Sequence, residues 1–595
     1  MHTKAFLVVL YVFTFSVSQA WAALSPAWQT HMTMTVEQLR DSQENLLILD
    51  ARQSNSEKAC IPHSIAVDWK TFYTPDHRTI LPDAERIALL SALGITGKEH
   101  VVIYDNGLQE GGAEMLFWML DSLGHPKASI LEGGWNAYKT AKLPLADTND
   151  IARPAHFEAT PRINATMPIQ ALMTVFGDYD LLMLDPRSDE EFIGWPLHGE
   201  SRGGHIRGSV NFNPIWAYTP QGMLKSEDEI RRLMYQKGIT PEKKFFVYSN
   251  FDARGAQLYF LLKLMGFDHV SLAGFTFNVW ADIPSLPVSS AANWKALVSP
   301  QWVDQLVRTG SAPTYNGKKF AVYEVSWGGM DKAKAYQEGH IPTAFHLDSD
   351  IFEDERHYWD LFPTEELLAR FASQGIDKDT TVIVYGNGSN TIAATVAFWA
   401  MKVAGVEDVR LLNGNFERWK SLGLPVDTTP HTPKAAKDFG RTTLLNPQYV
   451  TSTEGAKTLL TDPNGRLASV RSWEEYSGEV VRHSYIKAKG ELKGSHWARA
   501  GFGNNKSDLS FYFDVDGSYR SYAEIAAMWA AQDILPQHSV AFYCGTGSRG
   551  STGWFYSYLM GWPRSSLYDS GWYGWTEGQA VSPNPSQNIW EDTHQ

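Results

Sequence analysis

Residues Val540-Ala541-Phe542-Tyr543-Cys544-Gly545-Thr546-Gly547-Ser548-Arg549 join an apolar run to a polar, glycine-bearing loop that begins with a cysteine. The apolar run is typical of a buried strand, and a helix-like segment follows the loop. Gly545 and Gly547 allow the backbone to curl so that several N–H groups face inward, and the helix adds the positive end of its dipole. Such a loop binds an anion or stabilises a thiolate, so we expect Cys544 to be ionised at neutral pH.

The same unit occurs three more times earlier in the chain. Each copy has an apolar run ending in tyrosine, then a polar loop and a helix-like segment; the runs are residues 101–104, 245–248 and 382–385. Another strand-like run ends in a polar residue with an arginine two positions later, at Asp50-Ala51-Arg52, Asp185-Pro186-Arg187 and Ser469-Val470-Arg471. A turn then follows, as in Gly204-His205-Ile206 and Gly339-His340-Ile341.

Strands that alternate with helices at this density predict an α/β fold, in which a parallel sheet carries helices on both faces. The 595 residues are long enough for about four domains of ordinary size. We therefore expect four related α/β domains, at residues 30–146, 165–288, 299–427 and 446–583.

Composition and charge narrow the possible partners. Hydrophobic residues make up 43% of the chain and charged residues 20%, which is ordinary for globular domains. The net charge of −14 repels polyanions, so we expect no nucleic-acid partner. Two cysteines cannot build a disulfide framework, and the sequence shows little sign of familiar metal-binding or phosphate-binding motifs.

The first residues have the pattern of a secretory signal. Lys4 precedes an apolar run at residues 5–13, and Ala20-Trp21-Ala22 fits a cleavage site. We expect a signal peptide at residues 1–22 and a periplasmic mature protein. The alternative is an uncleaved membrane anchor, but the apolar run is shorter than the roughly 20 residues that a span needs. No later segment is apolar enough to span a bilayer, so we expect no membrane span after cleavage.

The loop Cys-x-x-Gly-x-Arg, the Gly-His-Ile turn and the Asp-x-Arg strand end together resemble the rhodanese family of sulfurtransferases, over nearly all of the mature chain. The resemblance implies four tandem rhodanese-like domains, of which the first three are inactive and the fourth is catalytic. It implies that Cys544 is the nucleophile and becomes a persulfide, whose outer sulfur lies against substrate-binding residues of the loop: Gly545, Thr546, Gly547, Ser548 and Arg549. The partners would be a small sulfur-donor anion and a thiol or cyanide-like acceptor, with a protein acceptor as a further possibility. The chemistry that the resemblance implies requires neither a metal nor an organic cofactor.

Several positions depart from the family pattern and leave the donor open between thiosulfate and 3-mercaptopyruvate. Thiosulfate-type members carry cations early in the loop, where this chain has Gly545 and Thr546, whereas mercaptopyruvate-type members lack the arginine at position 549. Glu475 and Ser469 replace an arginine and an aspartate of the pattern, and Arg471 and Arg499 are further candidates for the rim of the pocket. Arg549 could bind the substrate anion or tie the loop to the domain body.

The other three loops begin with Asp105, Ser249 and Gly386, and none of these can form a persulfide. Arg254 keeps the sixth position of the second loop, so that loop could still hold an anion. Cys60 occupies the turn position filled by His205, His340 and Glu491 in the other copies, which predicts a packing residue rather than a second nucleophile.

The leading hypothesis is therefore a sulfurtransferase that moves a sulfane sulfur through a Cys544 persulfide. The alternative is a non-enzymatic carrier that holds the persulfide sulfur, or selenium, for a partner docked on the inactive domains. A purely structural array and an anion-binding phosphatase or arsenate reductase are the remaining possibilities.

Overall fold

The structure is a computed structural model that describes residues 27–43, 45–53, 58–107, 111–251, 253–353, 359–388, 391–503 and 508–577. The expected signal peptide, residues 1–22, lies outside the described residues. The chain divides into two compact units: the N-terminal unit ends at Ser289, and the C-terminal unit begins at Ser290 and also takes in Ile193–Trp195.

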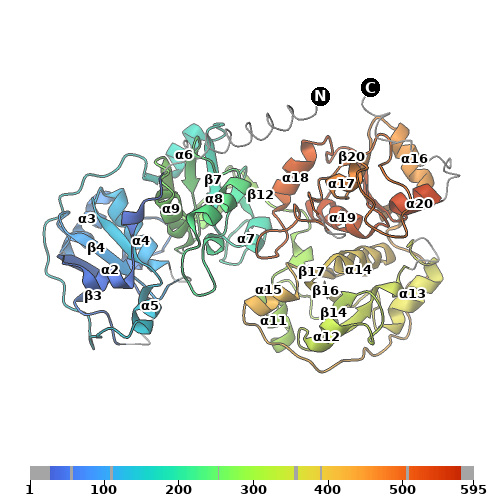
Figure 1. Cartoon of the computed structure of the whole chain (residues 1–595), viewed down its shortest axis with the longest axis horizontal. Coiled ribbons are helices and arrows are strands. Elements are labelled where there is room, and N and C mark those ends of the chain that lie inside the picture. The colour runs from blue at the N-terminus through green and yellow to red at the C-terminus, as the bar shows by residue number, and fades with distance from the viewer. Residues whose placement is uncertain are drawn as a thin grey trace, which may run out of the picture. The chain divides into compact units, whose positions relative to one another are not determined.

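Four five-stranded sheets confirm the predicted α/β architecture, with two sheets in each unit (Figure 1). Every pairing within them is parallel, and the strand order is the same in all four. In spatial order the strands are β1 (Thr33–Met34), β5 (Ala128–Leu131), β4 (His100–Tyr104), β2 (Leu46–Asp50) and β3 (Ser64–Ala66); β6 (Thr166–Met167), β11 (Val270–Ala273), β10 (Lys244–Val247), β7 (Leu181–Asp185) and β9 (Val210–Asn211); β13 (Leu297–Val298), β17 (Val409–Leu412), β16 (Thr381–Tyr385), β14 (Phe320–Ser326) and β15 (Phe345–Asp348); and β18 (Val450–Thr451), β22 (Ser565–Tyr568), β21 (Ser539–Tyr543), β19 (Gly465–Ser469) and β20 (His496–Trp497). A separate antiparallel pair joins β8 (His205–Ile206) to β12 (Val288–Ser289).

The main helices also repeat from domain to domain. The first helix of each domain is α2 (Val36–Asp41), α6 (Ile169–Val175), α11 (Pro300–Thr309) or α16 (Thr453–Thr461); the second is α3 (Asp83–Ala92), α8 (Glu227–Gln236), α13 (Thr364–Ser373) or α18 (Tyr522–Ala530); the helix after the central loop is α4 (Gly112–Ser122), α9 (Arg254–Leu264), α14 (Thr391–Ala404) or α19 (Ser548–Met560); and the last is α5 (Gly134–Thr140), α10 (Phe277–Asp282), α15 (Phe416–Ser421) or α20 (Gly571–Glu577). Short helices α7 (Asp189–Ile193), α12 (Lys334–Glu338) and α17 (Trp473–Tyr476) follow strands β7, β14 and β19.

Helices cover both faces of each sheet because side chains of a strand alternate between the two faces. In β21, Val540 and Phe542 pack with α18 and α19 in one hydrophobic cluster, whereas Ala541 and Tyr543 pack with α16 and α20 in another. All of these strand residues are buried. The continuous apolar runs seen in the sequence are therefore strands covered on both sides.

The two domains of each unit pack through the helices that follow their central loops. In the N-terminal unit, α4 packs against α9, where the Phe117 and Phe260 rings meet edge to face at 5.0 Å. In the C-terminal unit, α14 packs against α19 (Figure 1). The Phe398 and Phe555 rings meet there edge to face at 5.0 Å. Each of these helices lies between its own sheet and the partner helix, which explains why nearly all of its residues are apolar or small.

The tyrosine at the end of the central strand makes hydrogen bonds that hold neighbouring elements together. The Tyr104 and Tyr248 hydroxyls each donate to a buried aspartate carboxylate, Asp50 or Asp185, at 2.7 Å. The Tyr248 hydroxyl also accepts a hydrogen bond from the Ile206 amide in the Gly-His-Ile turn, at 3.0 Å. One hydroxyl thus joins the central strand, the neighbouring strand and the turn.

Among the described residues, no helix is long and apolar enough to cross a membrane.

We expect Tyr248→Phe to lower the free energy of unfolding of the N-terminal unit by about 1–3 kcal/mol, because the substitution leaves a buried amide without its acceptor and removes a donor to a buried carboxylate. Urea denaturation measures the change. Tyr179→Phe is the matched control, since that side chain is 87% exposed and its loss should change stability by less than about 0.5 kcal/mol. Equal effects of the two substitutions would contradict this account.

Candidate active site

Cys544 lies directly after β21, at the carboxyl end of the middle strand of the fourth sheet, and α19 begins four residues later. The Arg549 amide, in the first turn of α19, donates to the Cys544 Sγ at 3.3 Å. The side chain is buried, with 3% of its surface exposed. The thiol therefore faces the N-terminus of a thirteen-residue helix, where backbone amides and the helix dipole favour negative charge.

The carbonyl groups of the loop point away from the thiol toward α20. The Trp572 and Tyr573 amides donate to the carbonyl oxygens of Cys544 and Gly545, at 2.9 and 2.8 Å. Because the C=O and N–H of a trans peptide point in opposite directions, the amides of Gly545 and Thr546 face away from α20. The Arg549 amide reaches the Cys544 sulfur, and the fuller cradle of amides stays a prediction.

Gly547 is required by its conformation and by its neighbours. Its φ is 79°, in the left-handed region, and a Cβ atom there would lie 2.5 Å from the Asp569 carbonyl oxygen. No other residue fits without moving the strand end at Asp569. The predicted residues Gly545, Thr546, Gly547, Ser548 and Arg549 therefore lie together around the Cys544 end of α19.

The guanidinium of Arg549 is paired with Glu475 rather than left open to a ligand. Its two terminal nitrogens donate to the two Glu475 carboxylate oxygens at 2.6 and 3.0 Å, and both side chains are buried. Burial by itself would raise the pKa of Glu475, but the Arg549 charge and hydrogen bonds lower that pKa to about 2. The loop is thus tied to the helix that follows β19.

Domain 2 contains the same pair without a cysteine. Arg254 donates to both Glu191 carboxylate oxygens, at 2.6 and 3.2 Å, and Ser249 stands at the nucleophile position. There too burial opposes the shift, and the arginine lowers the carboxyl pKa to about 2. Because the pair persists where no persulfide can form, it favours the bracing role for Arg549 over direct anion binding.

Ser469 stands where the family pattern has an aspartate. Glu491, from the following turn, supplies a carboxylate in its place. Glu491 accepts from the Ser469 hydroxyl at 2.6 Å, from the Tyr543 hydroxyl at 2.6 Å and from Arg471 at 3.2 Å. Arg471 is 1% exposed and also donates to the Gly490 carbonyl, so it is part of this buried network and not of the pocket rim. Arg499, the other rim candidate, is half-buried, with its guanidinium 5.8 Å from the Trp497 ring.

Domain 3 contributes a segment to the site of domain 4. The Leu361 amide donates to the Asp569 carboxylate at 3.0 Å, and the Ser570 hydroxyl donates to Asp360 at 2.6 Å. Both contacts fall beside the loop, since Asp569 touches Gly547. Domain 3 therefore forms part of the surroundings of Cys544.

Three aromatic rings meet at the same place. The Trp359 ring lies 4.8 Å from that of Tyr485 and 5.5 Å from that of Tyr573, and the two tyrosine rings are 5.9 Å apart. Burial raises the pKa of Tyr485 to about 12, with a hydrogen bond to Thr546 opposing the rise. Tyr485 therefore remains a neutral hydrogen-bonding group at physiological pH, beside the cysteine loop.

Buried carboxyl groups surround the loop on the side of domain 3. Burial raises the pKa of Asp569 well above its usual value, and the neighbouring Glu353 and Asp360 raise it further. The pKa of Glu353 is raised by burial and by Asp350 and Asp360. A raised pKa favours the neutral form of each carboxyl group, which limits the negative charge that these groups place beside the loop.

The first loop contains a carboxylate side chain, that of Asp105, at its start. The Asp105 carboxylate accepts from the Gly107 amide at 2.8 Å and from the Ala113 amide at 3.1 Å, so it occupies the position where a bound anion would lie. Burial and the Asp105 charge raise the pKa of nearby Glu114 to about 8. This loop is suited to structure and not to sulfur chemistry.

Cys60 is buried, with its Sγ 3.8 Å from the Ala146 carbonyl, and burial raises the pKa of its thiol. Both cysteines are free thiols. Cys544 is thus the one described cysteine that lies in a loop built for a thiolate.

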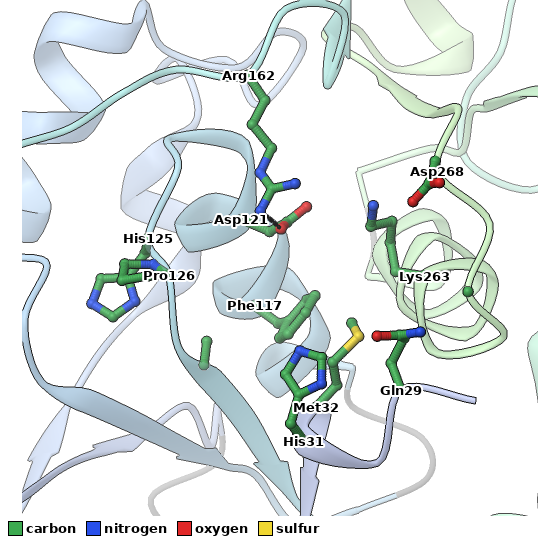
Figure 2. Close-up of a pocket in the computed structure, with 12 residues that line it drawn as sticks. Gln29, His31, Met32, Phe117, Asp121, His125, Pro126, Arg162, Lys263 and Asp268 are labelled. Atoms are coloured by element: carbon green, nitrogen blue, oxygen red, sulfur yellow. Dashed lines mark ion pairs between the residues drawn. The ribbon is translucent and has the colours of Figure 1, made fainter. Parts of the chain in front are cut away.

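A cavity of about 240 Å³ lies in the N-terminal unit, between the C-terminal ends of α4 and α9 (Figure 2). Asp121, at its edge, pairs with Arg162 at 3.0 Å and accepts from the Tyr259 hydroxyl at 2.6 Å. The central loops lie at the opposite, N-terminal ends of these helices. The cavity therefore lies away from the edge where open α/β sheets bind ligands.

A family model for the rhodanese-like domain matches residues 35–141, 170–281, 330–422 and 452–578. The chain therefore belongs to the rhodanese family and carries four rhodanese-like domains.

Similar proteins point to sulfur transfer. Thiosulfate sulfurtransferase YnjE of Escherichia coli is 34% identical over 394 residues, which cover 66% of this chain and 86% of that protein. Sulfur carrier protein TtuD of Thermus thermophilus is 29% identical over 299 residues, covering 48% and 94%. The solved structure of wild-type EanB has a TM-score of 0.65 and 30% identity, and covers 71% of this chain and 98% of that one. Another EanB structure holds ergothioneine covalently linked with its persulfide cysteine.

Sequence reasoning located the cysteine loop but missed most of its surroundings. Trp359, Asp360 and Leu361 come from another domain, and Tyr485 lies in a segment without regular structure. The one available signal was the aromatic group at residues 572–575, which the sequence predicts as core or pocket wall and which contributes Tyr573.

We expect Glu475→Gln to lower the free energy of unfolding of the C-terminal unit by about 3–5 kcal/mol at pH 7, because Arg549 keeps its charge in a buried position without a counter-ion. The pKa of Glu475 is lower in the folded chain, about 2, than its usual 4.5. Its stabilising effect is therefore complete above pH 4.5 and is lost as the pH falls toward 2. Urea denaturation of both proteins across this range measures the difference.

Glu191→Gln is the matched control, since it breaks the same pair in domain 2. It should destabilise the N-terminal unit while leaving sulfur loading of Cys544 unchanged. If Glu475→Gln left both stability and sulfur loading at the values of the unaltered chain, the bracing role would be wrong.

Proposed function

We propose that this protein is a sulfurtransferase that moves a sulfane sulfur from a donor such as thiosulfate or 3-mercaptopyruvate to a thiophilic acceptor, through a persulfide on Cys544. The Arg549 amide at 3.3 Å from the Cys544 Sγ, at the N-terminus of α19, is the observation that carries the proposal. The sulfurtransferase YnjE supports the same chemistry.

The reaction takes two displacement steps. The Cys544 thiolate attacks the outer sulfur of thiosulfate, the S–S bond breaks, and sulfite leaves with the bonding electrons. The acceptor then attacks the outer sulfur of the persulfide, and the Cys544 thiolate leaves. Amides of the loop stabilise the negative charge on sulfur in both thiolate and persulfide. The proposed place of action is the periplasm, after removal of the predicted signal at residues 1–22.

We expect incubation of the protein with thiosulfate or 3-mercaptopyruvate to add one sulfur atom to the chain, as measured by intact-protein mass spectrometry. Cys544→Ser should abolish the gain, because the nucleophile is lost. Cys60→Ser is the matched control and should keep it, since the Cys60 thiol is buried away from any anion-binding loop. A sulfur gain that survives Cys544→Ser would contradict the proposal.

An assay of repeated turnover distinguishes a sulfurtransferase enzyme from a non-enzymatic sulfur carrier. An enzyme releases sulfite or pyruvate repeatedly when cyanide or a thiol is supplied, whereas a carrier loads once and keeps its sulfur until a partner protein takes it. TtuD is named a sulfur carrier, which makes this distinction necessary. Stoichiometric loading without turnover would establish the carrier alternative.

A second candidate acceptor is a betaine that carries an imidazole ring, such as hercynine. In the EanB structures with hercynine or ergothioneine, the substituted tyrosine and threonine stand at the same sequence spacing from the persulfide cysteine as Tyr485 and Thr546 do from Cys544. In this chain the Thr546 side chain acts on Tyr485, since it opposes the rise that burial causes in the Tyr485 pKa. The aromatic rings beside the loop also suit a quaternary ammonium cation.

In this reaction the outer persulfide sulfur would enter the imidazole C–H bond, and the Cys544 thiolate would leave. We expect Tyr485→Phe to reduce sulfur transfer to hercynine at least about 10-fold, since one general-acid or hydrogen-bonding group contributes on that order or more. Loading of Cys544 from thiosulfate should not change. Liquid chromatography with mass spectrometry measures ergothioneine formed from loaded protein.

Tyr476→Phe is the control, because it removes another tyrosine hydroxyl of domain 4, one bonded to the Ser495 carbonyl. It should leave transfer to hercynine intact. If the unaltered, loaded protein formed no ergothioneine, hercynine would be excluded as acceptor while the Cys544 persulfide remained established by its own assay.

A further inference from the structure

Three potential metal ligands meet where the linker that leaves domain 3 crosses a turn of that domain. His340 lies in the Gly-His-Ile turn after α12, and Asp427 and His431 lie on the linker. One ligand atom from each of the three lies within 4.8 Å of the others. The Asp427 Oδ2 and the His431 Nε2 are already 2.9 Å apart.

The backbone holds the linker in place against the turn. The His340 amide donates to the Asp427 carbonyl at 2.8 Å, and the Asp427 amide donates to the His340 carbonyl at 2.9 Å. The His431 amide donates to the Tyr336 hydroxyl at 3.1 Å. The three side chains are therefore brought together by fixed elements, not by chance contacts of mobile side chains.

His340 has one ring nitrogen prepared to accept a ligand. The ring is fully buried and stacks on Tyr336 at 3.9 Å. Its Nδ1 lies 2.8 Å from the Tyr336 carbonyl oxygen, and since a carbonyl only accepts, Nδ1 carries the proton. The Nε2 is then a lone-pair acceptor, and it has no hydrogen-bond partner among the described residues. A histidine whose Nδ1–H is held by a backbone carbonyl is the usual form of a metal-binding imidazole.

The other domains show which part of this arrangement is specific to domain 3. In domain 2, His205 makes the same Nδ1 contact, with the Phe192 carbonyl at 2.8 Å, and stacks on Phe192 at 3.6 Å. The linker residue paired with His205 is Ser289, and Asn293 takes the place of His431. In domain 1, Cys60 pairs with Ala146. The stacked histidine thus has a structural role, whereas the carboxylate and second imidazole are additions of domain 3.

We propose that His340, Asp427 and His431 form a binding site for a divalent transition-metal ion, of which Zn²⁺ is the best match. Two imidazoles and one carboxylate are a common three-ligand set for Zn²⁺, with water as the fourth ligand. Ligand atoms of a tetrahedral Zn²⁺ site lie about 3.3–3.5 Å apart, so small rotations of the partly exposed Asp427 and His431 side chains complete the geometry. The ion takes the position of the present Asp427–His431 hydrogen bond.

The bound ion would cross-link the linker to the body of domain 3. Asp427 lies two residues before the proline-containing segment Thr429-Pro430-His431-Thr432-Pro433, and His431 lies within that segment, which begins the connection to domain 4. The site shares no residue with the Cys544 loop. The proposal is therefore independent of the sulfur chemistry and stands or fails by itself.

The test uses the full-length protein without an affinity tag, in the Cys544→Ser background, so that the reactive thiol cannot bind the metal. Zn²⁺ is titrated in competition with a chromophoric chelator, and thermal unfolding is recorded with and without Zn²⁺. We expect one Zn²⁺ per chain and a higher midpoint of unfolding when Zn²⁺ is present. Asp427→Asn and His431→Gln should each weaken Zn²⁺ binding at least about 10-fold and remove the stabilisation.

His63→Gln is the matched control, because His63 also pairs with an aspartate, Asp150, at 3.2 Å but lies on the surface without a third ligand. It should leave the Zn²⁺ affinity unchanged. Circular dichroism checks that each variant is folded, and two variants at partly exposed positions keep the test valid if one of them fails to fold. Absence of Zn²⁺ binding, or binding that Asp427→Asn and His431→Gln do not weaken, would overturn the proposal.

Discussion

A buried carboxylate beside the end of the central strand, found in domains 1, 2 and 4, is the interaction on which much of the rest depends. In domains 1, 2 and 4 it accepts a hydrogen bond from the tyrosine hydroxyl that ends the central strand, at 2.6–2.7 Å. Two strands and a turn are thereby held together at the edge where the catalytic loop begins. A buried charge is tolerated only when its hydrogen bonds are satisfied, so this edge is rigid by necessity. Domain 4 keeps the carboxylate although its source moves from the strand to Glu491 in the turn.

A second buried pair positions the loop itself. Arg549 contributes its amide to the Cys544 sulfur and its guanidinium to Glu475, so one residue links the thiol to the domain body. The charge of Arg549 is neutralised by that carboxylate, which leaves backbone amides as the main source of positive potential at the sulfur. On the other side, Asp569 and the domain 3 residues Asp360 and Leu361 border the loop. Domain 3, whose own central loop begins with Gly386, thus forms a wall of the site in domain 4.

The fold could be predicted from the sequence because each sequence feature that indicates it involves only neighbouring residues. Strand runs such as residues 540–543, glycines in the loop and repeated tyrosines each report on a few neighbouring residues, and four copies reinforce one another. The same locality made the Cys544 loop visible. The family pattern has an aspartate at position 469 and an arginine at position 475. Compared with that pattern alone, Ser469 and Glu475 each suggest that a charged interaction is missing. In the structure, Glu491 supplies the carboxylate that Ser469 lacks, and Glu475 neutralises Arg549.

The sequence by itself determined the four α/β domains, the cysteine at the end of a central strand and the glycines that shape its loop. Only the tertiary structure decided what surrounds that cysteine, because Trp359, Tyr485 and Tyr573 are distant in the chain and meet through packing. The tertiary structure also decided the role of Arg549. Its charge is evident from the sequence, but its pairing with Glu475 is not. The grouping of His340 with Asp427 and His431 has the same origin. Hydrogen-bond and ligand geometry depend on distances of a few ångströms, which chain spacing does not encode until the path of the backbone is known.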